Sequence, residues 1–396
     1  MKKRIFAGIL MICFVVGLVS GCGTTKLNGT DTVVTVGDEK ATLSSLMAMV
    51  RYQQAVTGDY YDSMYAQYEA QGMQLSMDDR WDSKAEISDE KDADVSGMKV
   101  KTSGDQLVDS VATTLSSYVV VCQHADEYGV SLTDDEKAKV DVVAENFLKN
   151  SDKDAIESDG ITEDGVKAYL QWYTLYDKIY DKYKEQSDIE ISEKESRNIG
   201  VSYLSFSIDA ESETYNTNAV VKKQAEQILN TFSGKDDLSE LNFQDFAGQY
   251  SNVYASTDSI PVEKDVTEGA ILSAEDVEAI SKLKDGQLYE KLLAGSNGTY
   301  YIYRVDKSTD KDASVQYANE LRDEKISDAF YEMMKDWKKD VKIEYNLALL
   351  DKIAVTDKVV YTGVKEEPTD EGAASGDAVQ SNGVKVESVE DIEQAE

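Results

Sequence analysis

Histidine is almost absent from this sequence, because His124 is the only one among 396 residues. Zinc sites built from several histidines and the H-E-x-x-H motif are therefore excluded. The chain also lacks a glycine-rich phosphate loop and the G-x-S-x-G nucleophile elbow. Its acidic residues number 76, so no pair of carboxylates stands out as an acid–base couple. We predict no metal site, no cofactor and no catalytic constellation of these kinds, and an inert, partly exposed ring at His124.

Cysteine is scarce as well, with Cys13, Cys22 and Cys122 as the whole set. Cys13 lies inside the apolar N-terminal segment and Cys22 directly follows it, so only Cys122 remains for the folded body. An intramolecular disulfide is therefore not expected. Cys122 belongs to an apolar pattern with helical spacing, which favours a buried packing thiol over a reactive one. Stability must come from packed apolar surface instead.

Positive charge is the next shortage. The chain has 41 lysines and arginines against 76 acidic residues, which gives a net charge of −35. A surface of this sign repels polyanions, so the composition argues against nucleic acid as a partner. It also argues against adhesion of the protein surface to anionic lipid.

The apolar run over residues 5–18 is too short to span a bilayer comfortably. Lys2, Lys3 and Arg4 precede it and Ser20-Gly21-Cys22 ends it, an order typical of a secretory signal over residues 1–21. The ending resembles the bacterial lipobox, which implies that the Cys22 thiol receives a diacylglyceryl group; the alternative is an ordinary signal with an incidental cysteine. Residues 22–31 then form a polar tether, and lipid chains hold the protein on the extracytoplasmic face of the cell membrane.

The strongest structural signal lies in residues 107–148. Apolar side chains recur there at helical spacing, and Gly129 is a natural helix stop. Thr133 and Glu136 fit the capping box that begins the next helix. A strand at residues 32–36 and a helix capped at Thr42 precede this stretch. A long polar loop over residues 72–104 separates that helix from the stretch. Residues 151–160 are predicted to form an acidic loop that lacks the glycine of a calcium-binding EF-hand.

A helix capped at Thr162 carries an aromatic stripe along one face. Such a stripe usually packs into a core. The alternative is an adaptable surface on which rigid amphipathic rings contact unfolded chains. The stripe consists of Tyr169, Trp172, Tyr173, Tyr176, Tyr180 and Tyr183, and the first four are the candidate client-binding residues.

The texture of the sequence changes after residue 196. A strand at residues 199–208, a helix at 218–232, a short helix at 242–250, a helix at 274–283 and a strand at 299–305 predict a compact α+β domain. A helix at residues 313–339 and a strand at 341–345 then follow. Residues 364–396 contain many acids and few large apolar side chains, which is typical of a disordered tail.

Segments in this order resemble the exported parvulin-type foldases, the PrsA and SurA group of chaperones and peptidyl-prolyl isomerases. The opening strand Thr32-Val-Val-Thr-Val-Gly37 is similar to the one that begins the mature domain of that group, and Ala125-x-x-Tyr-Gly129-Val-Ser-Leu-Thr133 looks like its N-terminal chaperone helices. Residues 199–305 share the element order of a parvulin domain. The resemblance implies an α+β protein in which a mainly helical, SurA-N-like chaperone domain (residues 32–196 plus 312–345) contains an inserted parvulin-like domain (residues 197–308).

The chain departs from the parvulin pattern where the family does its chemistry. The family usually has a histidine at the positions that resemble Tyr203 and Tyr301 here, and Val253 falls where an acidic or thiol side chain is typical. Isomerases lower a rotation barrier of ~18–20 kcal/mol about the X–Pro bond with a polar cluster beside an apolar pocket. Most of that cluster is replaced, so Tyr203 and Tyr301 are only weak catalytic candidates.

We therefore predict a lipid-anchored extracytoplasmic chaperone that binds unfolded exported polypeptides and has lost isomerase activity. An active peptidyl-prolyl isomerase is the first alternative. A solute-binding or structural envelope lipoprotein is the second, although the long predicted helices and the presence of only two prolines speak against the repeated strand–helix alternation of solute-binding proteins.

Overall fold

The computed structural model describes residues 26–70, 80–85, 95–267 and 269–356. It also describes the backbone of two short strands, β1 (Phe14–Val16) and β9 (Tyr361–Gly363), which pair antiparallel. The rest of the predicted signal peptide, the lipid site at Cys22 and the predicted acidic tail lie outside these residues. Within the described part of the chain, no helix combines the length and the hydrophobicity needed to cross a membrane.

The chain divides into two units, each with its own core. The helical unit comprises residues 1–186 and 330–396, and the sheet unit comprises residues 187–329. Helix α11 (Lys311–Asp340) begins in the sheet unit and ends in the helical unit.

The helical unit begins with the strands β2 (Thr32–Val36) and β3 (Glu39–Thr42). Its helices are α1 (Leu43–Ala70), α2 (Ser103–Cys122), α3 (Ala125–Tyr128), α4 (Asp134–Asn150), α5 (Lys153–Asp159) and α6 (Glu163–Gln186). After α11 come the strand β8 (Ile343–Tyr345) and helix α12 (Leu347–Leu350). The three strands form a sheet in the order β3-β2-β8, so β2 pairs with a strand from each end of the sequence.

Local signals start and stop these helices as the sequence predicts. The Thr133 side chain accepts the N–H of Glu136, and the Glu136 carboxylate accepts the N–H of Thr133 at 2.7 Å. This reciprocal pair satisfies two of the donors that a helix start leaves open. Gly129 ends α3 at φ 65°, a left-handed conformation that costs glycine little. The helices bury one continuous core with Leu46, Leu115 and Phe147 among its members.

The prediction of an acidic loop over residues 151–160 is wrong, because residues 153–159 form helix α5. The Asp152 carboxylate accepts the N–H of Ala155 at 3.0 Å and so caps the helix start. Gly160 ends the helix at φ 69°. A side chain at Gly160 would also meet the backbone nitrogen of Gly29 at 2.6 Å, so glycine is required there for two reasons.

The sheet unit contains a four-stranded antiparallel sheet in the order β5-β4-β7-β6. Its strands are β4 (Asn198–Phe206), β5 (Val253–Pro261), β6 (Leu293–Ala294) and β7 (Tyr300–Lys307). Its helices are α7 (Glu193–Ser196), α8 (Asn218–Phe232), α9 (Phe243–Ala247) and α10 (Ala274–Ile280). The sequence analysis does not predict the short helix α7 or the strands β3, β5 and β6.

Each face of this sheet covers a separate core because side chains alternate along the strands. Leu204 and Ile302 pack with α8 and α9 on one face. Val201 and Val305 pack with Val277 and Ile280 of α10 on the other face. Together with the helical unit, this arrangement confirms the α+β class.

Candidate functional site

The aromatic stripe of α6 lies against α2 and the C-terminal part of α11. The Tyr118 ring of α2 lies 5.9 Å from the Tyr173 ring and 4.8 Å from the Tyr176 ring, measured between centroids. Phe330 of α11 packs against Tyr176 at 5.7 Å and against Tyr180 at 5.1 Å. Aromatic pairs at these separations stabilise a packed core beyond the area they bury. The stripe thus packs between helices, and its rings remain partly exposed.

Trp172 and Tyr169 belong to the same packing between helices. The Cys122 thiol donates to the carbonyl oxygen of Trp172 at 3.3 Å. Burial raises the pKa of this thiol to about 12, so Cys122 is unreactive at neutral pH. The four candidate residues Tyr169, Trp172, Tyr173 and Tyr176 are all only partly exposed, and their role in binding an unfolded chain stays a prediction.

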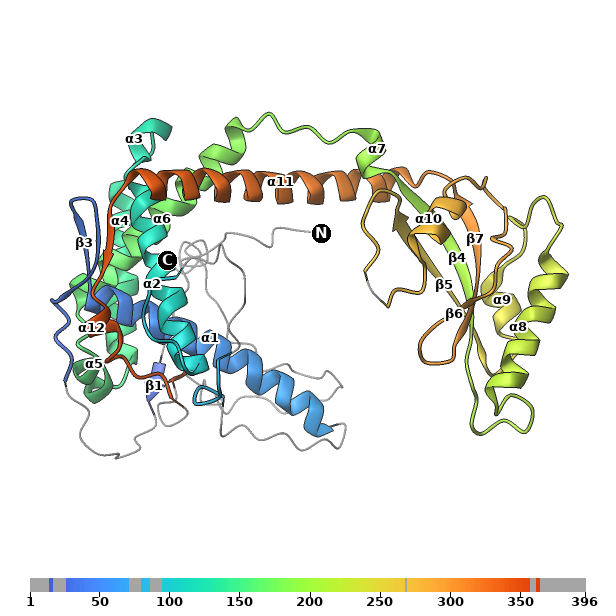
Figure 1. Ribbon diagram of the computed structural model, residues 1–396, viewed down its shortest axis with the longest axis horizontal. Helices are drawn as coiled ribbons and strands as arrows, with labels where there is room; N and C mark the ends of the chain where they lie inside the picture. The colour runs from blue at the N-terminus through green and yellow to red at the C-terminus, as the bar shows by residue number, and fades with distance from the viewer. Residues whose placement is uncertain are drawn as a thin grey trace, which may run out of the picture. The chain divides into compact units, whose positions relative to one another are not determined.

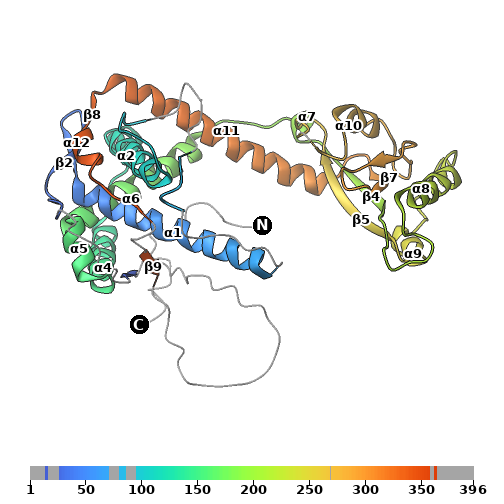
Figure 2. The same cartoon turned by 60° about the horizontal axis from the view of Figure 1, so that its bottom comes forward.

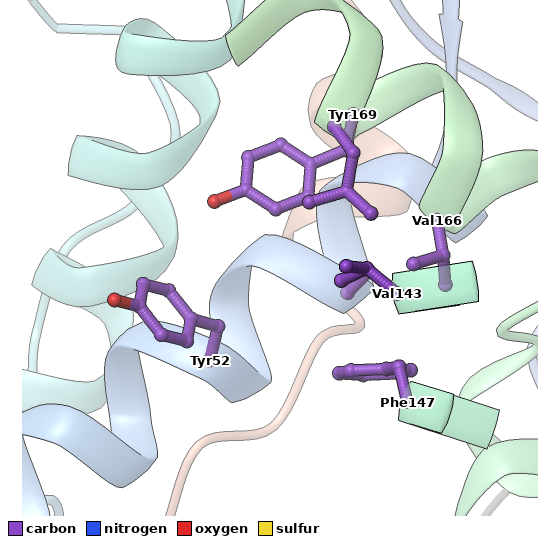
Figure 3. A pocket seen from close by; sticks show the side chains of 7 residues that line it. Tyr52, Val143, Phe147, Val166 and Tyr169 are labelled. Carbon is purple, nitrogen blue, oxygen red and sulfur yellow. The ribbon is translucent and has the colours of Figure 1, made fainter. Parts of the chain in front are cut away.

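A small crevice opens between α1, α4 and α6, lined by Tyr52, Val143, Phe147, Val166 and Tyr169 (Figure 3). The hydroxyls of Tyr52 and Tyr169 point to the same side of it. Burial raises the pKa of both tyrosines. The cavity volume of ≈ 20 Å³ has room for about one water molecule. It is therefore a packing defect of the core and too small to hold a substrate.

Asp177 lies among these tyrosines on α6, and nothing in the sequence singles it out from the other acidic residues. Its Oδ1 atom is buried and has no hydrogen-bond partner among the residues that the structure describes. Burial raises the pKa of Asp177 to about 7, against the effect of a hydrogen bond from Tyr173 and with a further contribution from Asp181. A carboxyl group with this pKa is largely neutral in mildly acidic solution and ionised in mildly basic solution.

The structure brings the two weak catalytic candidates together on the α10 side of the sheet. The ring centroids of Tyr203 on β4 and Tyr301 on β7 lie 6.0 Å apart, and Tyr303 lies 5.2 Å from Tyr203. Burial raises the pKa of Tyr303 further above its already high ordinary value. Tyr254 on β5 is 59% exposed on this face, opposite Ser205. We call Tyr203, Tyr254, Tyr301 and Tyr303 the tyrosine face.

The tyrosine face has no acid or thiol at the position that the parvulin pattern would fill. Val253 pairs with Phe206 and is buried in the core on the opposite side of the sheet. Asp276 of α10 accepts hydrogen bonds from Tyr289, Lys291 and Ser273 at 2.6–2.7 Å. Burial opposes ionisation of Asp276, yet these donors lower its pKa well below the usual range. Its oxygens are committed to the start of α10, so Asp276 is a structural group.

His124 packs on the C-terminal part of α11. The His124 ring is stacked on Trp337 with centroids 3.9 Å apart, and its Nδ1 atom lies 2.7 Å from a carboxylate oxygen of Glu127. Within the described ranges, no group of His, Cys, Asp or Glu side chains is arranged to hold a metal ion.

The outer half of α1 carries the most exposed aromatic surface of the helical unit. In Figures 1 and 2 this part of α1 extends beyond α2 and α6. Val56 is 42% exposed, Tyr60 66% and Tyr68 37%. The Tyr61 ring lies 5.8 Å from the Tyr60 ring and 6.3 Å from the Tyr65 ring. We call Val56, Tyr60, Tyr61, Tyr65 and Tyr68 the α1 patch, in which Tyr61 and Tyr65 are half-buried and the other three are exposed.

Comparison with known proteins gives structural neighbours and no sequence match. No protein-family model and no curated protein matches the chain. A PrsA peptidyl-prolyl isomerase from Bacillus cereus is 18% identical over 68% of this chain and 96% of its own, with a TM-score of 0.28. PrsA from Bacillus subtilis is 16% identical over 66% and 98%, with a TM-score of 0.19. The SurA-like chaperones PEB4 and Cj1289 of Campylobacter jejuni are represented by a structure 14% identical over 60% and 87%, with a TM-score of 0.20.

Likeness at this level assigns no activity. The three structures named above are of PrsA proteins and of SurA-like chaperones.

Proposed function

We propose that this protein is a chaperone that binds unfolded exported polypeptides outside the cytoplasm, held at the membrane by lipid on Cys22. The observation that carries the proposal is the α1 patch. A folded protein normally covers its large aromatic side chains, and a contiguous exposed group of them on one helix is typical of a surface that contacts another chain. Tyrosine rings suit this role because they offer rigid, amphipathic contact area at a low cost in side-chain entropy.

The charge of the protein supports the same role. At a net charge of −35, molecules of the chaperone repel one another and stay soluble while they expose aromatic surface. The same charge favours exported segments that are uncharged or basic. The lipid on Cys22 would keep this surface close to the membrane from which such chains emerge.

Removing the aromatic rings of the α1 patch should weaken binding of unfolded chains by roughly tenfold, about 1.4 kcal/mol. The variant carries Tyr60→Gln, Tyr65→Gln and Tyr68→Gln, since glutamine keeps the helix propensity high. The measurement is suppression of light scattering while a chemically unfolded protein is diluted into buffer containing the mature chain. A matched control on the same helix carries Gln53→Ala, Ser63→Ala and Gln67→Ala. Equal protection by both variants and the wild type would rule out the α1 patch.

An active peptidyl-prolyl isomerase is the second candidate, favoured by the 6.0 Å separation of the Tyr203 and Tyr301 rings. We expect no acceleration of a proline-limited refolding reaction, because the buried Val253 stands where the parvulin pattern has an acidic or thiol side chain. The measurement is the slow refolding phase of a model protein, with wild type and with Tyr203→Phe and Tyr301→Phe. A faster slow phase that either substitution abolishes would show that the hydroxyls catalyse rotation and that isomerase activity is retained.

A further inference from the structure

Strand β5 forms an outer edge of the sheet in the sheet unit. It has 9 residues and pairs with β4 along its whole length without a register shift. Its central residues, from Tyr254 to Asp258, are exposed except for Ala255, which is half-buried. An edge strand presents a row of unpaired backbone groups on its outer side. Figure 1 shows β5 beside β4 at the margin of this sheet.

The direction of each backbone group in β5 follows from the ladder. The N–H of Ser207 donates to the carbonyl oxygen of Asn252 at 3.0 Å, and the N–H of Val262 donates to that of Arg197 at 3.0 Å. Hydrogen-bonded pairs alternate along an antiparallel ladder. The backbone N–H and C=O groups of the even-numbered residues of β5 therefore bond to β4, and those of the odd-numbered residues point away from β4.

Two outward residues keep both backbone groups available. Within the described part of the chain, the N–H and C=O groups of Ala255 and Thr257 have no hydrogen-bond partner. The outward N–H of Ser259 is taken by the carboxylate of Asp258 at 2.8 Å. Pro261, which has no N–H, closes the end of the edge. The open stretch is thus centred on Thr257 and suits a short added strand.

The usual protections of an edge are missing from the stretch of β5 between Tyr254 and Thr257. Natural edges are blunted by lysines, by prolines within the strand, by bulges or by a very short strand. The sequence of β5, VYASTDSIP, has no lysine and no proline before its last residue, and its pairing shows no bulge. Its one charge is that of Asp258. A sheet edge left open over this length serves strand addition by another chain.

We propose that β5 binds an extended segment of an unfolded polypeptide as an additional strand of this sheet. This inference rests on the proposed chaperone function and specifies how it captures a client. The backbone groups of Ala255 and Thr257 supply hydrogen bonds that do not depend on the client sequence. Tyr254, Ser256 and Asp258 line the tyrosine-face side of the added strand. They favour a client that alternates aromatic or β-branched residues with uncharged or basic ones.

A client segment fits this edge better than a second copy of the protein does. Two copies that meet at β5 would each bring a net charge of −35 and repel each other. Edge-to-edge pairing of two copies would also place Asp258 of each strand near the other without adding a basic side chain. A basic or neutral client segment meets neither obstacle.

The decisive variant is Thr257→Pro, which removes an outward N–H and leaves the ladder with β4 intact, because proline is tolerated where the N–H faces solvent. Thr257→Val is the matched control, since it keeps the N–H and a β-branched side chain. The probe is a fluorescent peptide of about nine residues that alternates valine with serine or threonine and has a lysine at each end. We expect the full mature chain and Thr257→Val to bind it, and Thr257→Pro to bind at least about tenfold more weakly in fluorescence anisotropy.

Two further measurements make the result independent of the stability of the proline variant. A peptide with N-methyl groups on alternate amides should bind the wild type only when the methyl groups face away from β5. Hydrogen exchange at the amides of Ala255 and Thr257 should slow when the unmethylated peptide binds. Binding that is indifferent to Thr257→Pro and to the position of the methyl groups would overturn strand addition.

The outcomes separate this inference from the proposed function. If Thr257→Pro and the wild type bind the peptide equally and suppress aggregation equally, the edge is not the site and the chaperone function stands. If the wild type neither binds the peptide nor suppresses aggregation, both fail. If sedimentation shows a wild-type dimer that Thr257→Pro converts to a monomer, the occupant is a second copy, which also overturns the inference.

Discussion

Replacing Arg51 with methionine should lower the free energy of unfolding of the helical unit by about 3–5 kcal/mol. Arg51 lies on α1, and its side chain is 4% exposed. Its Nε and Nη2 atoms donate to the two carboxylate oxygens of Asp159 at 2.8 and 3.1 Å, and Nη1 donates to Gln54 at 2.8 Å. The variant would leave the Asp159 carboxylate buried without its charged partner, and that loss is much larger than the loss of one exposed ion pair.

A urea titration followed by circular dichroism measures this effect through the shift in the unfolding midpoint. The double variant Arg51→Met with Asp159→Leu should recover much of the loss, because it removes the orphaned charge together with its partner. Lys339→Ala is the matched control, since its ion pair with Asp336 is exposed at both side chains (71% and 72%), and it should leave the midpoint unchanged. A midpoint for Arg51→Met as high as that of Lys339→Ala would contradict the assignment.

Asp177→Asn should stabilise the helical unit in basic solution and leave it unchanged in acid. The pKa of Asp177 is raised by burial from its ordinary value of 3.8 to about 7. The folded state therefore holds a proton that the unfolded state has released, and this group's contribution to stability falls as pH rises from about 4 to 7. Above pH 7 the folded protein bears the full cost of the buried charge. Asparagine avoids that cost and still accepts a hydrogen bond from Tyr173.

The expected gain for Asp177→Asn is about 2–4 kcal/mol at pH 8 and near zero at pH 4. The measurement is the difference in unfolding free energy between variant and wild type at several pH values, which cancels the contributions of carboxylates that do not interact with Asp177. Glu185→Gln, at an exposed position of the same helix, is the matched control. A pH-independent difference for Asp177→Asn would mean that the carboxylate is already ionised in the folded state across this range.

Local signals explain the parts of the fold that were predictable from the sequence. The capping box of Thr133 and Glu136 and the stop at Gly129 depend on residues within a few positions of one another, so a single sequence displays them. The helix at residues 218–232 was predicted with the bounds that the structure has, because its apolar spacing is regular.

The composition of α5 and β5 explains why the sequence did not predict these two elements. The acidic composition of helix α5 predicts a loop, although Asp152 and Gly160 provide a helix cap and a helix stop. Strand β5 has few apolar residues because its middle is exposed, so it lacks the alternation by which strands are predicted. The exposure that makes β5 a candidate binding edge is thus also the reason why its sequence shows no strand pattern.

Contacts between residues that are far apart in the sequence could not be predicted from it. Arg51 and Asp159 are 108 positions apart, and each is one charged residue among many in the sequence. The pKa of Asp177 depends on its burial beside tyrosines from α2 and α6. Tyr203 and Tyr301 were named from the resemblance alone, and their proximity became visible only through the pairing of β4 with β7.

The central position of β2 in its sheet has a consequence for how the chain is made. Val34 pairs with Ala41 on one side and with Tyr345 on the other. A chain synthesised from its N-terminus therefore cannot complete this sheet until nearly the whole sequence has emerged. At roughly 5–20 residues per second that delay is on the order of tens of seconds. During it β2 has a partner on one side only, and its other edge stays open to pairing with another chain.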